Sequence, residues 1–184
     1  MKKKSVGLGK IMYMEWLFPI HNYYKTLRLN EKVYEVIFPI IVATISVFLY
    51  SYFGKMGKAL DSLSQILPSA ISILIGFTAM LITILLTSSG ENVNNLKKIE
   101  TDVKLNKKLV TLYQKLHIQL THALFNEIML LLLIFFYLFV SGIFVDLVFQ
   151  RVCLFFSVFL TLNILLSILR GITSIYFSFY NEKI

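Results

Sequence analysis

The feature that most constrains the fold is an unbroken apolar run in the second half of the chain. Every residue from Met129 to Val140 is apolar or aromatic, and no Gly or Pro interrupts the run before Gly142. A helix that is apolar on all sides is surrounded either by a large core or by lipid. Because only 15% of the 184 residues are charged and 57% are hydrophobic, the composition is that of an integral membrane protein.

Three further apolar runs predict three more membrane spans. Pro39 and Pro68 lie near the starts of the first two, where a missing backbone N–H does least damage. The expected fold class is an all-α integral membrane protein, with four transmembrane helices and a cytoplasmic helical extension between spans two and three. The expected segments are a basic, aromatic leader (1–32), span 1 (33–53), span 2 (66–88), a cytoplasmic loop and amphipathic stem (89–125), span 3 (126–145), span 4 (152–171) and a cytoplasmic tail (172–184).

The positions of lysine and arginine predict the orientation. Fifteen of the eighteen fall in the leader, in the 89–125 connection, or from the end of the fourth span onwards, whereas Lys55, Lys58 and Arg151 lie on the other side. Because positively charged loops stay in the cytoplasm, both termini and the long connection are expected there, in a cell inner membrane. Juxtamembrane lysines also attract anionic lipid, so the net charge of +8 does not call for direct nucleic-acid binding.

The stretch from Lys104 to Val145 predicts one long helix that stands in the cytosol and then enters the membrane. Thr101 is expected to cap its first part, the stem, in which leucines recur at spacings of four, three and four residues on one helix face. The stripe is covered by a neighbouring subunit, the rest of the loop, the inner lipid surface or a separate partner, and self-association is the expectation. The leucines are Leu105, Leu109, Leu112 and Leu116, and the lysines expected to contact anionic lipid or an acidic cytosolic protein are Lys97, Lys98, Lys104, Lys107, Lys108 and Lys115.

Two stripes of small and weakly polar residues predict close contacts between helices. Small side chains let membrane helices approach and form interhelical hydrogen bonds, although a weakly polar face also suits a water-filled path. Packing in a homo-oligomer is the expectation. The stripe of span 2 is Ser69, Ser72, Gly76, Ala79 and Thr83, and that of span 4 includes Ser157 and Thr161, with Asn163 near the midplane facing protein rather than lipid.

Polar residues outside these stripes indicate anchoring rather than catalysis. The leader, with aromatic residues such as Trp16 among its lysines, suits an interfacial anchor or, alternatively, a partner-docking arm. Arg170 lies 19 residues after Arg151, so both reach opposite interfaces as snorkelling side chains.

A metal site is not expected. His117, His122 and Glu127 are spaced by five residues, which puts successive side chains roughly 140° apart on a helix. Glu127 is expected near a membrane boundary, outside any intramembrane relay. The sequence has no phosphate-binding loop, dinucleotide fingerprint or hydrolase motif. We therefore expect neither an enzyme nor a cofactor.

The layout resembles that of small bacterial membrane proteins. The run ILIGFTAMLITILLTSSGENVNNLKK, from Ile73 to Lys98, followed by the stem is similar to four-span proteins of anti-phage defence systems. These are the membrane subunit of the Kiwa system and the small membrane accessories of type VI-B CRISPR loci. The resemblance implies a homo-oligomer that senses envelope disturbance or perturbs the membrane together with a cytosolic protein. It carries over no functional residues.

Three functions are compatible with this pattern. The first is an oligomeric membrane sensor or scaffold that docks a cytosolic partner. The second is a pore or membrane-perturbing effector, lined by the stripes of spans 2 and 4. The third, a small transporter subunit, is disfavoured because no acid at the membrane midplane, no inverted repeat and no broken-helix pattern is evident.

Overall fold

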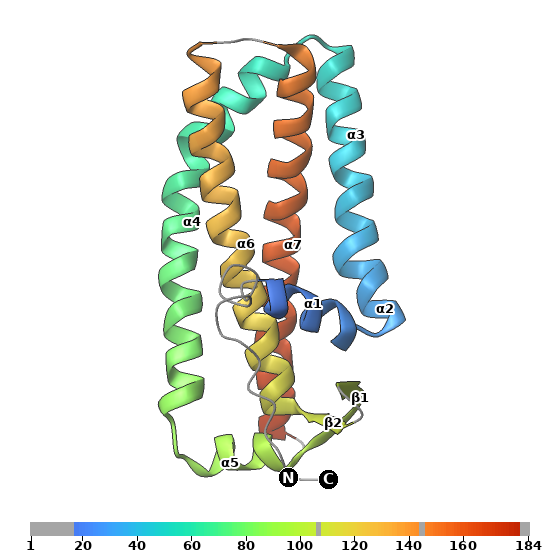
Figure 1. Ribbon diagram of the computed structural model, residues 1–184, viewed down its shortest axis with the longest axis vertical. Helices are drawn as coiled ribbons and strands as arrows, with labels where there is room; N and C mark the ends of the chain where they lie inside the picture. The colour runs from blue at the N-terminus through green and yellow to red at the C-terminus, as the bar shows by residue number, and fades with distance from the viewer. Residues whose placement is uncertain (1–16, 106–107, 144–145, 181–184) are drawn as a thin grey trace, which may run out of the picture.

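The computed structural model describes residues 17–105, 108–143 and 146–180, and four long helices that run side by side dominate it (Figure 1). All four are long and apolar enough to cross a membrane, over Leu29–Tyr52, Met56–Thr87, Leu112–Ser141 and Leu147–Tyr176. This confirms the prediction of four such helices and fits a multi-pass membrane protein. The elements are α1 (Leu17–Thr26), α2 (Leu29–Lys32), the π-helical η2 (Val33–Ile37), α3 (Phe38–Tyr52), α4 (Met56–Thr87), α5 (Glu91–Lys98), β1 (Glu100–Leu105), β2 (Lys108–Thr111), α6 (Leu112–Ser141) and α7 (Leu147–Tyr180).

Helices α6 and α7 form the centre of the bundle. Helix α4 packs against α6, and α3 packs against α7 on the other side (Figure 1). Apolar side chains fill the space between them, because each helix turns one apolar face inward. The largest buried clusters centre on Ile71, Leu130 and Ile164, on Leu60, Tyr137 and Leu154, and on Leu85, Leu96 and Leu116.

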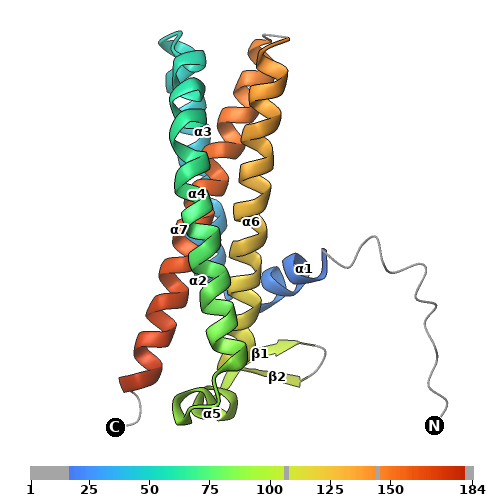
Figure 2. The ribbon, with the colours of Figure 1, turned by 90° about the vertical axis from the view of Figure 1, so that its left-hand side faces the viewer.

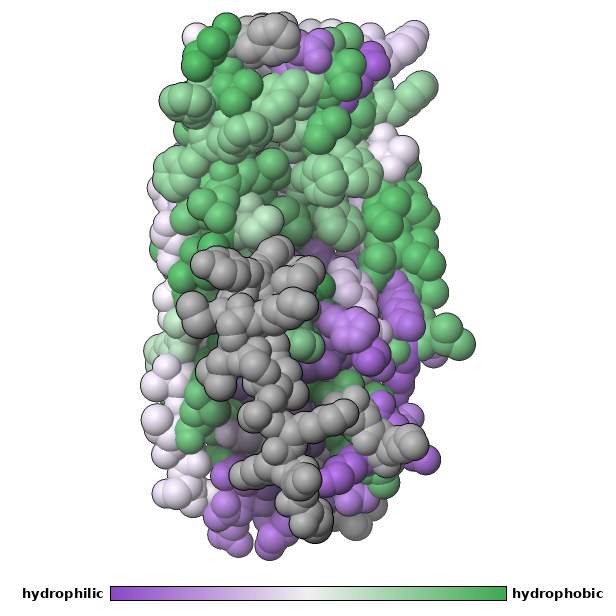
Figure 3. All heavy atoms as spheres, viewed as in Figure 1, coloured by the Kyte–Doolittle hydropathy of each residue, from purple (hydrophilic) through white to green (hydrophobic). Residues whose placement is uncertain are grey.

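The two ends of the bundle differ in what they carry. The turn end holds the α3–α4 and α6–α7 connections, and the hairpin end holds α5, β1, β2 and the last turns of α7 (Figure 1). Hydrophilic residues gather toward the hairpin end, whereas the rest of the visible surface is mostly apolar (Figure 3). Phe48, Ile73 and Phe139 are each about 70% exposed. These residues belong to an exposed apolar belt around the bundle, and a surface of this kind contacts a partner or a membrane.

Helix α4 is longer than the predicted second span. It begins at Met56 rather than at residue 66, because Met56 and Leu60 are buried against Tyr137 and Leu154 of the central helices. Residues 56–65, which lie between the predicted spans 1 and 2, therefore form more than two helical turns. Pro68 lies inside the helix instead of near its start.

The predicted stem helix is wrong over its first part. Strands β1 (Glu100–Leu105) and β2 (Lys108–Thr111) pair as an antiparallel hairpin, in which Leu105 pairs with Lys108 and Lys104 pairs with Leu109. Thr101, expected as a helix cap, instead donates its hydroxyl to the carbonyl of Val110 across the hairpin, 2.6 Å away. The four leucines therefore do not share one helix face, since two lie in strands and two in α6.

Helix α6 begins at Leu112 because Thr111 and Gln114 form a capping box. The Thr111 hydroxyl accepts from the Gln114 backbone N–H at 3.3 Å, and the Gln114 side chain accepts from the Thr111 N–H at 3.1 Å. Two donors at the helix start are thereby satisfied, which fixes where the helix begins.

Candidate functional site

Four charged side chains converge near the hairpin end of the bundle. Glu31 lies in α2 and Glu35 in η2, the two short helical segments that lead into α3. Lys115 lies in α6 and Arg170 in α7. Arg170 lies 2.7 Å from Glu35 and 3.1 Å from Glu31, and Lys115 lies 2.7 Å from Glu31. The cluster balances two negative charges with two positive ones. Balance is necessary here because Glu35 is fully buried and the other three are at most 18% exposed.

The π-helical turn brings Glu35 to this position. Residues Val33–Ile37 are wound more widely than an α-helix, and such turns occur often at functional sites. The carbonyl of Glu35 accepts a 2.7 Å hydrogen bond from the side-chain amide of Asn163 on α7. Glu35 is therefore held from both its backbone and its side chain.

Tyr23 anchors α1 to the cluster. Its ring is fully buried and stacks on His122 of α6 with centroids 3.7 Å apart. Its hydroxyl donates to the Glu35 carboxylate and lies 2.9 Å from the Ser167 hydroxyl. Helix α1, which projects from the bundle beside α6 (Figure 2), is thus bonded into the bundle. The part of the leader before Leu17, which includes Trp16, lies outside the described residues, so its expected role as an interfacial anchor stays a prediction.

A second set of hydrogen-bonded polar side chains extends toward the centre of the bundle. Asn126 donates to the side-chain oxygen of Asn163 at 2.7 Å and lies 3.0 Å from Nε2 of His122. All three side chains are buried. Asn163 was expected to face protein rather than lipid, and it does so within one chain. The network joins α1, α6, α7 and the π-helical turn into one unit.

A groove opens between the hairpin and the start of α6. It has a volume of about 500 Å³, and its walls are mainly Leu105, Leu109, Val110, Tyr113 and Ile118. Lys108 lies at its edge, and the Lys97 ammonium sits 5.1 Å above the Tyr113 ring. The groove is therefore apolar inside and basic outside.

The predicted contact residues are divided between these features. Leu116 is buried and Leu112 partly buried against Leu85 and Leu96, so their cover comes from the same chain rather than from a neighbouring subunit. Leu109 is 41% exposed and lines the groove with Leu105. Among the lysines, Lys97, Lys98, Lys104 and Lys108 are exposed, Lys115 is paired with Glu31, and Lys107 lies outside the described residues.

The two stripes of small residues face in opposite directions. In α4, Ser69, Ser72, Gly76 and Thr83 are exposed and Ala79 is partly exposed. In α7, Ser157 and Asn163 are at most 4% exposed and Thr161 is partly buried. Ser157 and Asn163, both expected at an oligomer interface, are instead packed inside their own chain, because α7 is a central helix of the bundle.

The described histidine and acidic side chains do not gather into a metal site. His122 contacts Tyr23 and Asn126, whereas Glu127 faces Thr78 of α4. Within residues 17–105, 108–143 and 146–180 there is no group of three or more His, Cys, Asp and Glu side chains that could hold a metal ion.

The sequence interpretation missed the ion cluster. Arg170 was expected to snorkel, and Glu31 and Glu35 were given no role. One signal was present: Glu35 is an acid inside a predicted span, and such residues usually pair with a charge on another helix. Comparison with protein-family models, with curated proteins and with solved structures finds no match.

Proposed function

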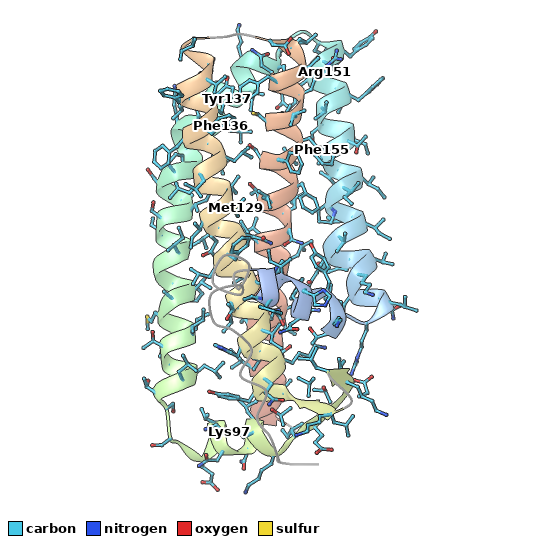
Figure 4. The ribbon with its side chains drawn as sticks, viewed as in Figure 1. Lys97, Met129, Phe136, Tyr137, Arg151 and Phe155 are labelled. Carbon is cyan, nitrogen blue, oxygen red and sulfur yellow. The ribbon has the colours of Figure 1, made fainter. Side chains whose placement is uncertain are left out.

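We propose that the chain spans a cell inner membrane four times, with its hairpin end and both termini in the cytoplasm. The support is the exposed apolar belt together with the fifteen-to-three division of lysine and arginine. Arg151 and Lys97 lie at opposite ends of the bundle (Figure 4). The 19 residues from Arg151 to Arg170 span about 28 Å of helix, close to the hydrocarbon thickness of a bilayer.

Within this orientation, the chain acts as a membrane sensor or scaffold that docks a cytosolic protein. The observation that carries this function is the groove at the hairpin end, with its apolar walls and basic rim. The segment that fits it has apolar side chains flanked by acidic ones, because complementary charges steer association and fix orientation. The ion cluster gives the groove a rigid support. We propose anti-phage defence as the process in which the chain acts, because its four-span layout resembles that of membrane proteins in such systems.

The assembled form is a homo-oligomer joined through α4. Its stripe of small residues faces away from the chain's own core, and no described atom lies within 4 Å of a Cβ built on Gly76. Close approach of a second helix is what such stripes allow. Anionic lipid binds the lysines that the cytosolic partner leaves free.

A pore is the second candidate function. The observation that favours it is the exposed, weakly polar stripe of α4. The α7 stripe is packed inside the chain, so a path through a single copy has no lining on that side. A pore would have to be built from several copies around exposed α4 faces.

Photo-crosslinking tests the docking function. A benzophenone amino acid at Leu109, which is exposed in the groove, should capture a cytosolic protein in cells. The same group at Phe139, which is exposed near the turn end, is the matched control and should capture only lipid or a second copy. Charge reversal of Lys104 and Lys108 should reduce capture at residue 109 without changing expression. Equal capture of the same protein at both positions would contradict the proposal.

A further inference from the structure

Glu127 occupies the middle of the bundle. It lies on α6 twelve residues after Lys115 and ten before Tyr137, or about 18 Å and 15 Å along the helix. Met129, two residues away, lies midway between the ends of the bundle (Figure 4). Along α6, Glu127 therefore lies well away from both ends of the helix. Its side chain is fully buried, between α6 and α4.

Among the described residues, the carboxyl group of Glu127 has a single polar partner. Oε1 accepts a 2.8 Å hydrogen bond from the hydroxyl of Thr78, which is itself fully buried. Oε2 is buried and has no hydrogen-bond partner among the described residues. Ala123 and Leu130, on the same face of α6, belong to the central apolar cluster. The group therefore sits in an apolar environment with half of its hydrogen-bonding capacity unused.

No described cation neutralises this carboxyl group. On α4 the charged residues are Lys58 and Asp61, which lie toward the turn end. On α7 Arg170 is paired with Glu31 and Glu35, and Arg151 bonds to Ser51. On α6 the titratable neighbours toward the hairpin end are Lys115, which is paired with Glu31, and His117 and His122, and α1 contributes His21, Tyr23, Tyr24 and Lys25. Across residues 17–105, 108–143 and 146–180 none of these forms an ion pair with Glu127.

From this geometry we infer that Glu127 and Thr78 form a proton-binding site between α4 and α6. An isolated carboxylate in an apolar interior is so costly that the group takes up a proton instead. An ionisable side chain at such a depth also marks a functional position by default. Release of the proton places an uncompensated charge between the two helices, and that charge loosens their contact unless water enters. The site lies away from the groove and does not depend on the docking function.

Infrared difference spectroscopy of the purified protein in lipid nanodiscs tests this site. The wild-type protein at neutral pH should show the carbonyl stretch of a protonated carboxylic acid, which is separate from the carboxylate bands, and the band should vanish at alkaline pH. Glu127→Gln should lack the band while keeping an acceptor for Thr78. Glu35→Gln is the matched control, since Glu35 is equally buried but has Arg170 as a partner, and it should keep the band.

Glu127→Asp guards against a misfolded glutamine variant, because it retains an acid in a shifted environment and should move the band rather than remove it. Absence of the band in the wild-type protein at neutral pH would overturn the inference. So would persistence of an unchanged band in folded Glu127→Gln, or its loss in Glu35→Gln.

Discussion

Two helices of this bundle carry nearly the same sequence pattern and use it in opposite ways. Helix α7 turns its small and weakly polar residues inward, where Ser157, Asn163 and Ser167 are buried by the same chain. Helix α4 turns its stripe outward, and a Cβ built on Gly76 has no described atom within 4 Å. The pattern therefore indicates that a face suits close contact. It does not indicate which helix makes that contact.

The cause of the difference is what surrounds each stripe. The α7 stripe is flanked by groups that need partners inside the bundle. Gln119 donates to the backbone carbonyl of Ser167 at 2.5 Å, and Asn163 donates to that of Glu35. In α4 the exposed hydroxyls of Ser72 and Thr83 donate to carbonyls one turn earlier in their own helix. These hydroxyls are satisfied locally, so the outward face tolerates an apolar environment.

The largest expected effect comes from removing the cation beside the inward face of α7. Arg170→Met leaves Glu31 and Glu35 without their shared partner, and breaking a buried pair in this way costs about 3–5 kcal/mol. Denaturant unfolding in mild detergent measures the loss. Adding Glu35→Gln to the variant should restore part of the stability. A single variant as stable as the wild-type protein would show that the cluster does not support the inward face.

The next effect tests how tightly α7 is packed. A Cβ on Gly171 would lie 3.6 Å from the Gln119 side chain and 3.7 Å from that of Leu120, which is ordinary contact. Gly171→Ala should therefore be tolerated, whereas Gly171→Leu overpacks the α6–α7 contact and should destabilise the protein by about 1–3 kcal/mol. Thermal unfolding of both variants checks this, and equal stability of the two would argue against close packing.

The outward stripe should respond differently to the same change. Gly76→Leu meets no described atom within its own chain, so its unfolding free energy should stay within about 0.5 kcal/mol of the wild-type value. The proposed oligomer should dissociate in this variant, because a large side chain prevents close approach of helices. Mass determination in detergent measures the assembly. A variant that unfolds as readily as Gly171→Leu would erase the distinction between the two faces.

The smallest effect is expected at a solvent-exposed ion pair, which gives a baseline for the buried cluster. Arg28 bonds to Asp102 of the hairpin, and this bond holds the pKa of Asp102 below its usual value. The pair therefore stabilises the fold above the usual aspartate pKa, and this contribution is lost as the pH falls through the lowered pKa. Exposed pairs of this kind contribute little. Asp102→Asn should leave the unfolding midpoint at neutral pH nearly unchanged, and a large drop there would show that the start of α2 and the hairpin are coupled more strongly than the exposed pair suggests.

The apolar runs were sufficient to predict the four long helices, because an all-apolar segment of that length has few alternatives. Helix ends were harder to predict. The leucine spacing from Leu105 to Leu116 fits a helix, yet the hairpin forms because Thr101 and Val110 bond across it and Thr111 caps α6. Local capping and strand pairing outweighed the periodicity.

The ion cluster could not be located from periodicity. Glu35 and Arg170 are distant in the sequence and meet only because α3 and α7 pack together. Their charges indicate that each needs a partner, but not which one. The same holds for Tyr23, whose contacts with His122 and Ser167 depend on how α1 folds back onto the bundle. Contacts of this kind follow from the tertiary arrangement and leave no mark in local spacing.

The junction between hairpin and bundle has a mechanical consequence. Thr111 is both the last residue of β2 and the cap of α6, so no flexible linker separates the strand from the helix. A second tie is the 2.8 Å hydrogen bond from the Leu112 N–H to the Ile99 carbonyl. The hairpin is therefore joined directly to a helix long enough to cross a membrane. A molecule that binds the hairpin and changes its orientation should for this reason also change the tilt or rotation of α6.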